Sequence, residues 1–364
     1  MKKAVIVTEC RKYCFNFGET LQAVALNRVI QHLGFESVTA SYENRIRDIR
    51  YRISIYPKMY ITRGIKFELF RIRNMKYPVF RSCHKEHFSK LLKKADVIFC
   101  GSDCIWYEAC YNEIFFLNFP DIKVPKIAYA PSLRNSRVRN RTYKLKAAQW
   151  IKGIDYLSTR ERDGSNIIQE MIQDKSVSTV LDPTLLSGKK EWDAMCSKQI
   201  IKEPYILCYM LGKTKTIGRF VSQVAQHYNN HKIIWIEMEG NNGYCCGQHL
   251  SKVGPAEFLS LIRYSDAVIT DSFHGTAFSI IYHKQVYAVK RIVDSRDNYS
   301  YDCRIKNIME LLNIDNYYNK CDIIDFDKAN IDYLEVEKKL KRLRRKSMNY
   351  IKSALKEEGL LENL

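Results

Sequence analysis

The sequence has no run of eighteen apolar residues and no pair of cysteines in the spacing CxxC. The first absence argues against a membrane-spanning helix. The first three residues lead straight into the apolar segment 4–7, so we also expect no signal peptide. Several of the twelve cysteines lie in apolar, strand-like segments, as Cys100 and Cys208 do. Together these features predict a cytoplasmic protein whose thiols are mostly free and buried.

Recognisable metal and nucleic-acid motifs are lacking as well. Cys10, Cys14, Cys83, His84 and His87 are the residues that could suggest a metal site. Their spacings match no familiar zinc site, and cysteine is commonly buried as a small hydrophobic residue. We therefore expect no metal and no cofactor. The basic charge of the chain is accompanied by no nucleic-acid motif, so nucleic acid is not an expected partner.

Acidic residues are in the minority, with 40 Asp and Glu against 59 Lys and Arg and a formal net charge of +19. The excess is concentrated in a basic insert, residues 45–94, with fifteen basic and three acidic side chains, and in a second cluster at 338–346. This excess of basic residues favours an acidic partner, and anionic lipid, phosphorylated small molecules and acidic polysaccharides are all partners of that kind. The clusters are explained either as solvated helix faces or as a docking surface for the inner face of an anionic membrane.

Short apolar strands alternate with helical patterns along the whole chain, which predicts parallel sheets covered on both faces. The expected strands are 4–8, 38–41, 96–100, 126–130, 156–159, 205–210, 232–237, 266–270 and 285–289. The expected helices are 20–33, 142–151, 165–173, 217–228, 255–264, 276–282 and 305–312.

A chain of 364 residues is too long for one ordinary core. The two series of strands and helices predict an α/β fold of two Rossmann-like, doubly wound domains that face a cleft. The expected N-terminal domain is 1–190, the C-terminal domain is 200–330, and the boundary lies near 189–203. Residues 331–364 are expected to form a basic amphipathic helix that packs on the body.

The segment CFNFGETLQAVAL, residues 14–26, joins a strand to a helix. Asn16 and Glu19 are suited to a turn or a helix cap. Asn16 and Gly18 would also let the backbone approach a ligand at the start of a helix. A plain capped turn and a binding loop remain equally good interpretations here.

A second polar turn, FCGSDCIW at 99–106, follows an apolar strand. Ser102 and Asp103 would face a crevice at the end of that strand and could bind sugar hydroxyls. An Asx-type turn explains the same residues.

The third candidate is Arg160, directly after a strand in the segment TRERD. An arginine at the carboxyl end of a strand can hold a carboxylate or a phosphate with two parallel hydrogen bonds. The alternative is a surface ion pair with Glu161 or Asp163.

The most informative segment is VITDSFHGTAFSIIYHKQVYAV, residues 268–289, in which a strand, a polar turn, a helix and a strand follow closely. His274 and Gly275 fall in the first turn of the helix, where unsatisfied backbone N–H groups favour an anion. Ser272 stands just before them, and Lys290 and Arg291 follow the next strand at the same sheet edge. His274 is either a structural histidine that is hydrogen-bonded within the turn, for example to Asp271, or part of a site.

Arg160, His274, Lys290 and Arg291 would together form a site, built from both domains, for a small anion with two charged ends.

Seven short segments follow one another in a fixed order along the chain. They are NFGETLQAVAL (16–26), GSDCIW (101–106), KIAYAPS (126–132), STRERDG (158–164), VLDPTLL (180–186), VGPAEFLSLI (253–262) and SDAVITDSFHGTAFSII (265–281). In this order they resemble the polysaccharide pyruvyl transferase family. Two departures fall in the N-terminal half: Cys104 stands where Gln is common, and Leu133-Arg134 replaces the usual Phe-Gly-like pair.

The resemblance implies a GT-B-like fold and an enzyme of exopolysaccharide biosynthesis at the bacterial cell surface. Its expected reaction moves pyruvate from phosphoenolpyruvate onto a saccharide, free or lipid-linked, as a ketal. Arg160 and His274 would be catalytic and, with Ser272, Gly275, Lys290 and Arg291, would bind the donor. Asn16, Gly18, Glu19, Ser102 and Asp103 would bind the acceptor.

Two alternatives stay open from the sequence. One is a glycosyltransferase of the same architecture that uses a nucleotide-sugar. The other is a non-catalytic relative that binds an anionic saccharide or lipid.

Overall fold

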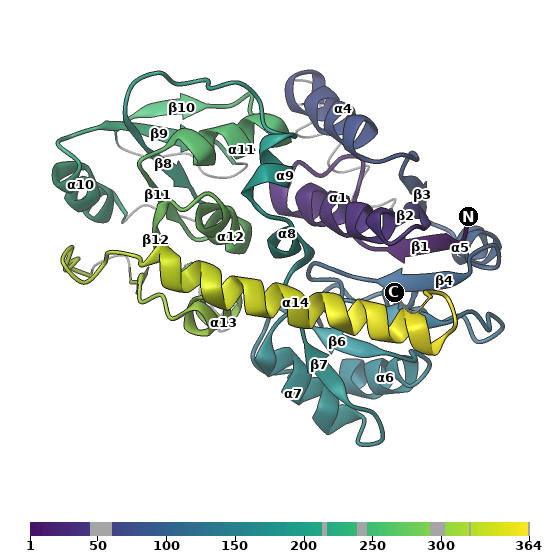
Figure 1. Ribbon diagram of the computed structural model, residues 1–364. Coiled ribbons are helices and arrows are strands. Elements are labelled where there is room, and N and C mark those ends of the chain that lie inside the picture. Colours follow the sequence, from purple (N-terminus) through teal and green to yellow (C-terminus); the bar gives the residue numbers. More distant parts are fainter. Residues whose placement is uncertain (44–59, 213–216, 239–245, 292–302, 320–321, 363–364) are drawn as a thin grey trace. The chain divides into compact units, whose positions relative to one another are not determined.

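Two series of βα units form two separate parallel sheets in a computed structural model (Figure 1). The structure describes residues 1–43, 60–212, 217–238, 246–291, 303–319 and 322–362. These residues belong to two α/β units. Unit 1 comprises Met1–Leu186 and Arg342–Leu364, and unit 2 comprises Ser187–Lys341.

The main sheet of unit 1 has the strand order β3-β2-β1-β4-β5, and every pair in it is parallel. In β1 all residues but the first are buried, as expected for a strand covered on both faces. The strands are β1 (Lys3–Val7), β2 (Glu36–Tyr42), β3 (Phe80–Ser82), β4 (Val97–Cys100) and β5 (Lys126–Ala128). A second, two-stranded sheet consists of β6 (Leu157–Thr159) and β7 (Val177–Thr179).

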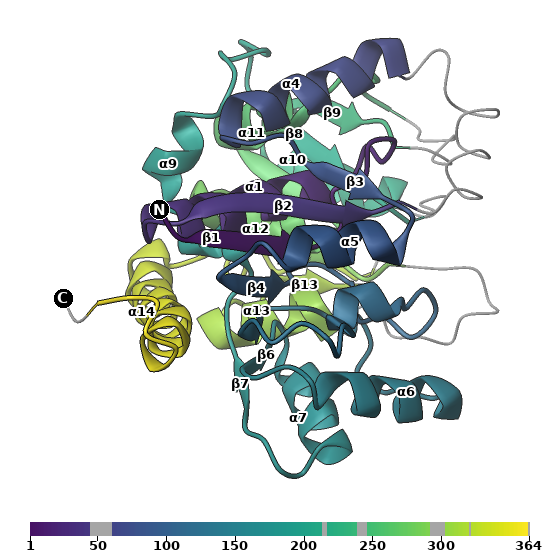
Figure 2. The ribbon, with the colours of Figure 1, turned by 90° about the vertical axis from the view of Figure 1, so that its right-hand side faces the viewer.

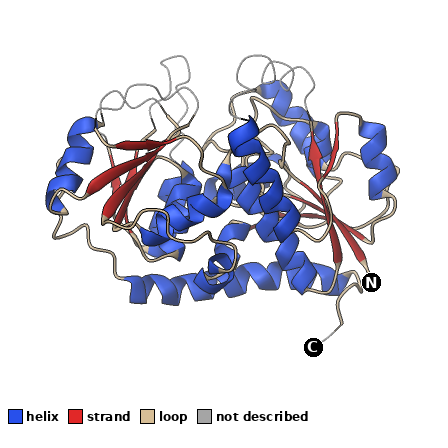
Figure 3. Cartoon of the chain, turned by 90° about the horizontal axis from the view of Figure 1, so that it is seen from above, coloured by secondary structure: helices blue, strands red, loops and turns tan. Residues whose placement is uncertain are grey.

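Helices cover both sides of the sheet in each unit (Figure 3). In unit 1 they are α1 (Phe17–His32), α4 (Ile65–Asn74), α5 (Lys85–Leu92), α6 (Arg141–Ile151), α7 (Arg162–Met171) and the short α8 (Pro183–Leu186). Gly34 follows the C-cap residue of α1, Leu33, and has the left-handed φ of +92° that favours glycine after a helix. A π-helical turn, Tyr60–Gly64, and a 3₁₀ turn, Glu113–Phe116, complete the unit.

The sheet of unit 2 repeats the topology of the first, with the order β10-β9-β8-β11-β12-β13 and parallel pairs throughout. Its strands are β8 (Tyr205–Tyr209), β9 (Lys232–Ile236), β10 (Gln248–Leu250), β11 (Ala267–Thr270), β12 (Gln285–Val289) and β13 (Tyr317–Tyr318). Its helices are α9 (Lys189–Asp193), α10 (Gly218–His227), α11 (Pro255–Tyr264), α12 (Phe273–Ile281) and α13 (Cys303–Leu312). The expected α/β class with doubly wound parallel sheets in two domains is confirmed.

The last helix, α14 (Tyr333–Glu357), runs from unit 2 into unit 1. In its C-terminal part Tyr350 donates a hydrogen bond to the Ala128 carbonyl over 2.9 Å, and Leu355 belongs to a buried cluster of unit 1. The helix then brings the two termini close, since Lys2 Nζ donates to the carbonyls of Gly359 and Leu360 at 3.1 and 2.9 Å (Figure 2).

The units therefore differ from the domains expected at 1–190, 200–330 and 331–364. The division falls after Leu186, and the C-terminal helix is shared rather than separate. The physical reason is that its final apolar turns complete the core of unit 1.

The basic insert is only partly a charged surface. Its residues 44–59 lie outside the described part of the chain. In the described part, α4 and α5 cover the sheet, and Arg63 and Arg71 are buried. Arg71 donates to Glu68 Oε1 over 2.7 Å and to Thr20 Oγ1 over 3.0 Å, so part of the charge is paired internally.

Candidate functional site

Strand order reverses between β1 and β4 in unit 1 and between β8 and β11 in unit 2. In open α/β sheets ligands bind beyond the carboxyl ends of the strands at such a reversal. Loops that follow these four strands contain most of the residues singled out in the sequence. Each unit therefore offers one candidate site, and the two are described separately.

In unit 1 the turn before α1 is a capped helix start. Asn16 Oδ1 accepts hydrogen bonds from the N–H groups of Gly18 and Glu19 at 2.9 and 3.4 Å. The Glu19 carboxylate is 1% exposed and is bound by Arg11, whose Nη2 lies 2.7 Å from Oε2. The turn interpretation is thus confirmed for Asn16, and the acceptor-binding role of Asn16, Gly18 and Glu19 stays a prediction.

The loop after β4 places Ser102 and Asp103 at the reversal point. Ser102 is fully buried, and its Oγ donates to Asp182 Oδ2 over 2.9 Å while its N–H donates to Gln22 Oε1 over 3.1 Å. Asp103 has a left-handed φ of +69°, and its Oδ1 accepts the Cys104 N–H over 2.8 Å. Ser102 therefore ties the loop to α1 and to Asp182, Asp103 bonds within the loop, and the acceptor-binding role of both residues stays a prediction.

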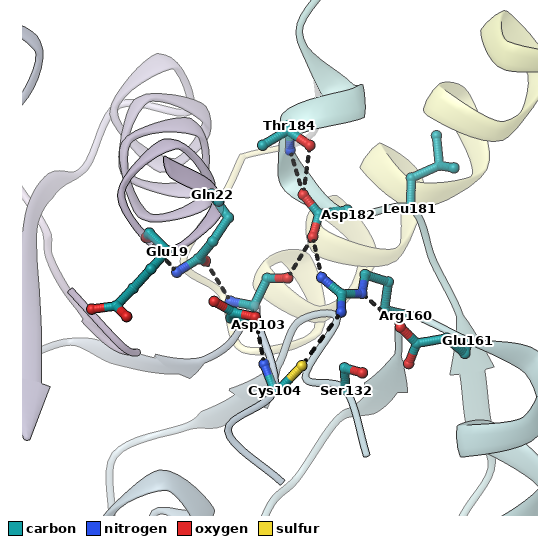
Figure 4. Close-up of polar contacts among 12 residues, drawn as sticks. Glu19, Gln22, Asp103, Cys104, Ser132, Arg160, Glu161, Leu181, Asp182 and Thr184 are labelled. Carbon is teal, nitrogen blue, oxygen red and sulfur yellow. Dashed lines mark hydrogen bonds and ion pairs between the residues drawn. The ribbon is translucent and has the colours of Figure 1, made fainter. Parts of the chain in front are cut away.

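Arg160 lies at the centre of a buried polar network in unit 1 (Figure 4). Its Nε donates to Glu161 Oε1 over 2.7 Å, its Nη1 donates to Asp182 Oδ2 over 2.8 Å, and its Nη2 points to Cys104 Sγ at 3.9 Å. Burial opposes the charged form, but the two carboxylates outweigh it and hold the pKa of Arg160 well above its usual value. The expected surface ion pair is in fact a buried one.

Asp182 connects this network to the rest of unit 1. Besides Ser102 and Arg160, it accepts hydrogen bonds from the N–H and the hydroxyl of Thr184 at 3.0 and 2.7 Å (Figure 4). It is 1% exposed. Asp182 is not among the candidate residues named from the sequence, although the segment VLDPTLL around it is one of those that carry the family resemblance.

In unit 2 the strand β11 and the helix α12 meet in a tight turn. Ser272 caps α12, and its Oγ accepts the Gly275 N–H over 3.3 Å. A Cβ at Gly275 would lie 2.4 Å from Thr270 Oγ1. This close approach explains why a glycine follows His274, because no larger residue fits between the helix and the strand.

We expect Gly275→Ala to overpack this turn and to destabilise unit 2 by about 1–3 kcal/mol. Thr270 cannot yield easily, because its hydroxyl donates to the Tyr209 carbonyl over 2.6 Å and accepts the Ser272 N–H over 3.1 Å. Thermal unfolding would measure the loss. Gly188→Ala is the matched control, since the nearest atom there is the mobile end of Glu191, and an equal loss in both variants would contradict the argument.

Asp271 organises the loops around this turn. Its two carboxylate oxygens accept the N–H groups of Leu211 and Gly212 at 2.6 and 2.8 Å. Arg291 approaches the same residue, with Nη2 2.8 Å from the Asp271 carbonyl and Nε 3.5 Å from Oδ2. Lys290 is exposed after β12. The expectation that the loops after β11 and β12 share one sheet edge is confirmed.

His274 is the second residue of α12 and is 6% exposed, with its ring 5.1 Å from that of Phe273. It thus lies in the first turn of a helix, where backbone N–H groups attract an anion. The structure brings His274, Ser272 and Arg291 together in unit 2. Arg160 belongs to unit 1, and its convergence with His274 stays a prediction.

Among the described residues, no group of three or more His, Cys, Asp or Glu side chains is placed to hold a metal ion. Within the same residues, none of the helices is both long enough and apolar enough to cross a bilayer.

Comparison with known families decides how the two sites should be interpreted. The family model described as polysaccharide pyruvyl transferase matches residues 16–291, which include β4, β8, β11 and the helix α1 that follows β1. This chain belongs to the polysaccharide pyruvyl transferase family. The resemblance seen in the sequence is thereby confirmed. Membership of this family supports the expectation that the protein is a transferase. No curated protein matched the sequence.

Solved structures show the fold of this polysaccharide pyruvyl transferase family member. S. aureus MnaA in complex with UDP is 11% identical, with a TM-score of 0.57, over 99% of this chain and 98% of that one. Arabidopsis thaliana UGT89C1, complexed with UDP-L-rhamnose, is 12% identical, with a TM-score of 0.53, over 99% of both chains. A putative UDP-N-acetylglucosamine 2-epimerase from Listeria monocytogenes is 10% identical, with a TM-score of 0.53, over 96% and 90%. These neighbours confirm the GT-B-like class and carry no information about substrate.

Proposed function

We propose that this protein transfers a pyruvyl group from phosphoenolpyruvate to a sugar of a cell-surface polysaccharide or of its lipid-linked precursor, forming a ketal. The observation that supports the proposal most directly is the family match, which runs through both sheets. The turn at His274 adds a chemical reason, because it combines a helix start, an imidazole and nearby cations in unit 2. Phosphoenolpyruvate presents the two anionic groups that such residues bind.

The proposed reaction consists of protonation of phosphoenolpyruvate, attack by one sugar hydroxyl with loss of phosphate, and attack by a second hydroxyl. A proton is added to C3 of phosphoenolpyruvate, and positive charge develops at C2. One sugar hydroxyl attacks C2 and gives up its proton, the C2–O bond to phosphate breaks, and a second hydroxyl attacks C2 to close the ketal. The second hydroxyl also gives up its proton, so that of the two protons released one balances the proton added to C3 and the other leaves with the phosphate. One inorganic phosphate is released for each pyruvyl group transferred.

In this proposal His274 either transfers the proton to C3 or binds the departing phosphate, and Lys290 and Arg291 hold the anionic groups. Ser272 and Gly275 shape the helix start that faces the donor. Arg160 would contact the donor from unit 1. Glu161 and Asp182 hold the Arg160 guanidinium in one orientation.

Phosphate release is the direct test. The protein would be incubated with phosphoenolpyruvate and a panel of lipid-linked and free saccharides, and inorganic phosphate and the ketal would be measured together. We expect phosphate to appear only with a saccharide that has two suitably placed hydroxyls, in a one-to-one ratio with the ketal. Consumption of a UDP-sugar in place of phosphoenolpyruvate would overturn the proposal in favour of a nucleotide-sugar glycosyltransferase. Binding of saccharide without turnover would indicate a non-catalytic relative.

We further propose that α14 brings the enzyme to an anionic membrane, where lipid-linked sugars are found. Six of its basic side chains are exposed: Lys338, Lys341, Arg342, Arg345, Lys346 and Lys356. Each basic residue near an anionic surface contributes about 1 kcal/mol. This contact would make the protein peripheral to the inner face of the membrane.

Co-sedimentation with phosphatidylcholine vesicles, with or without phosphatidylglycerol, tests the membrane contact. We expect binding only with the anionic lipid, weakened by salt, and a fall of about tenfold or more in R342E/R345E, because two favourable charges are reversed. K306E is the control, since Lys306 lies on α13 beside Glu310. Binding that depends on neither the lipid charge nor the salt concentration would contradict the proposed membrane contact.

A further inference from the structure

A pair of loops in unit 1 holds polar atoms that the protein itself does not satisfy. Asn135 is 4% exposed, and neither its amide oxygen nor its amide nitrogen has a hydrogen-bond partner. Glu108 is 6% exposed, and its Oε1 also has no hydrogen-bond partner. More than nine in ten buried polar groups in proteins are partnered. An unpartnered one costs about 1–3 kcal/mol.

The two residues lie on loops that are fastened together on both sides of Asn135. On one side the Arg134 guanidinium lies over the Tyr107 ring, 4.9 Å from its centroid. On the other side Glu108 Oε2 accepts the N–H groups of Arg139 and Asn140 at 2.9 and 2.8 Å. Asn135 is therefore held against the segment that contains Tyr107 and Glu108.

These loops follow β4 and β5, at the carboxyl edge of the sheet in unit 1. The Ser132 N–H donates to the Asp103 carbonyl over 2.8 Å, which ties the loop of Asn135 to the reversal point. Asp103 and Arg134 have left-handed φ angles of +69° and +66°. Such strain costs roughly 1–2 kcal/mol for each non-glycine residue and is typically found at ligand clamps.

We propose that Asn135, Glu108 and Arg134 form the binding subsite for the saccharide. An amide nitrogen can donate to one sugar hydroxyl while the amide oxygen and Glu108 Oε1 accept from its neighbours. The guanidinium of Arg134 adds donors, and the Tyr107 ring offers an apolar face. A molecule with several adjacent hydroxyls satisfies all three unpartnered atoms at once, whereas a simple anion satisfies only the amide nitrogen.

The unpartnered atoms have almost no solvent contact, so the saccharide must part the loop from Tyr107 to reach them. Ser136 and Arg137, next to Asn135, are exposed and leave the outer side of the loop open to solvent. The buried Asn135 amide has no hydrogen-bond partner in the closed loop. The free energy needed to open the loop is therefore lower, because Asn135 gains hydrogen bonds as soon as the loop moves. Without a ligand the subsite is therefore closed, and a hydroxylated ligand stabilises its open form.

The inference rests on the proposed function only for the class of ligand. Its test is binding without phosphoenolpyruvate. Saturation-transfer NMR would be recorded with the full chain and the methyl glycosides of glucose, galactose, mannose, N-acetylglucosamine and glucuronate. We expect at least one glycoside to bind, and Asn135→Leu to weaken its binding by about tenfold, which corresponds to about 1.4 kcal/mol. Glu108→Gln, which keeps an acceptor for Arg139 and Asn140, should weaken binding as well.

The same Asn135→Leu variant should raise the thermal midpoint, because it removes a buried polar group that has no partner. Asn349→Leu, the same change at an exposed position of α14, is the matched control and should alter neither quantity. The proposal is overturned if no glycoside binds the wild type, if Asn135→Leu binds like the wild type, or if that variant is destabilised. Phosphate release is independent of these readings, so a protein that binds glycosides through Asn135 and leaves phosphoenolpyruvate intact would refute only the proposed function.

Discussion

Asp182→Ala is expected to lower the free energy of unfolding of unit 1 by about 3–5 kcal/mol, because it removes one partner of a buried ion pair. Arg160 Nη1 and the Ser102 hydroxyl donate to this carboxylate from two separate loops, and the N–H of Thr184, in α8, donates to it as well. After the substitution these three donors lose this acceptor, and Glu161 is the carboxylate that still accepts a hydrogen bond from the guanidinium. No other side chain named at the carboxyl edge of unit 1 connects as many segments.

Hydrogen exchange is the suitable measurement, because the two units need not unfold together. We expect the amides of α1, β4 and β6 to lose protection while those of β8 and β11 in unit 2 keep theirs. Asp325→Ala is the control, since Asp325 pairs with Lys328 on the surface over 3.0 Å and is 54% exposed. Unchanged protection in unit 1 of the Asp182 variant would show that the network is not needed for stability.

The sequence predicted the parts of this fold that depend on local pattern. Buried strands such as β1 and β11 stand out as apolar runs, and the expected placement of His274 and Gly275 in the first turn of α12 is confirmed. The strand order of each sheet could not be predicted from local sequence patterns, because strand pairing joins residues that are far apart in the sequence. An example is the parallel register of Val5 with both Val38 and Ile98. The family resemblance agreed with the two-domain architecture that the alternation of strands and helices already predicted.

The candidate sites show the same limit more sharply. His274 could be singled out because one short segment contains the strand, the turn and the helix that position it. The environment of Arg160 could not be foreseen, because its partner Asp182 lies 22 residues further along the chain. Glu108 and Asn135 went unnoticed for a related reason, since a missing partner leaves no signal in a sequence and becomes visible only when every contact is known.

His274→Gln is expected to lower the turnover of phosphoenolpyruvate by about 10²- to 10⁴-fold, the usual effect of removing a general acid or base. Glutamine keeps a polar side chain in the first turn of α12, and the Ser272 cap that starts the helix is untouched. The fold of unit 2 should therefore survive, so the loss reports on chemistry. His283→Asn, at the far end of the same helix and at a φ of +54° that asparagine tolerates, is the matched control.

The kinetic constants separate the two roles open to His274. Loss of proton transfer lowers kcat and leaves the KM for phosphoenolpyruvate nearly unchanged, whereas loss of a phosphate contact made in the ground state raises KM. A proton donor also gives the wild type a pH profile with a limb that the variant lacks, and a phosphate ligand gives a variant whose affinity for inorganic phosphate falls. Full activity in His274→Gln, with the control equally active, would show that this histidine is structural and would move the search for the proton donor to other residues.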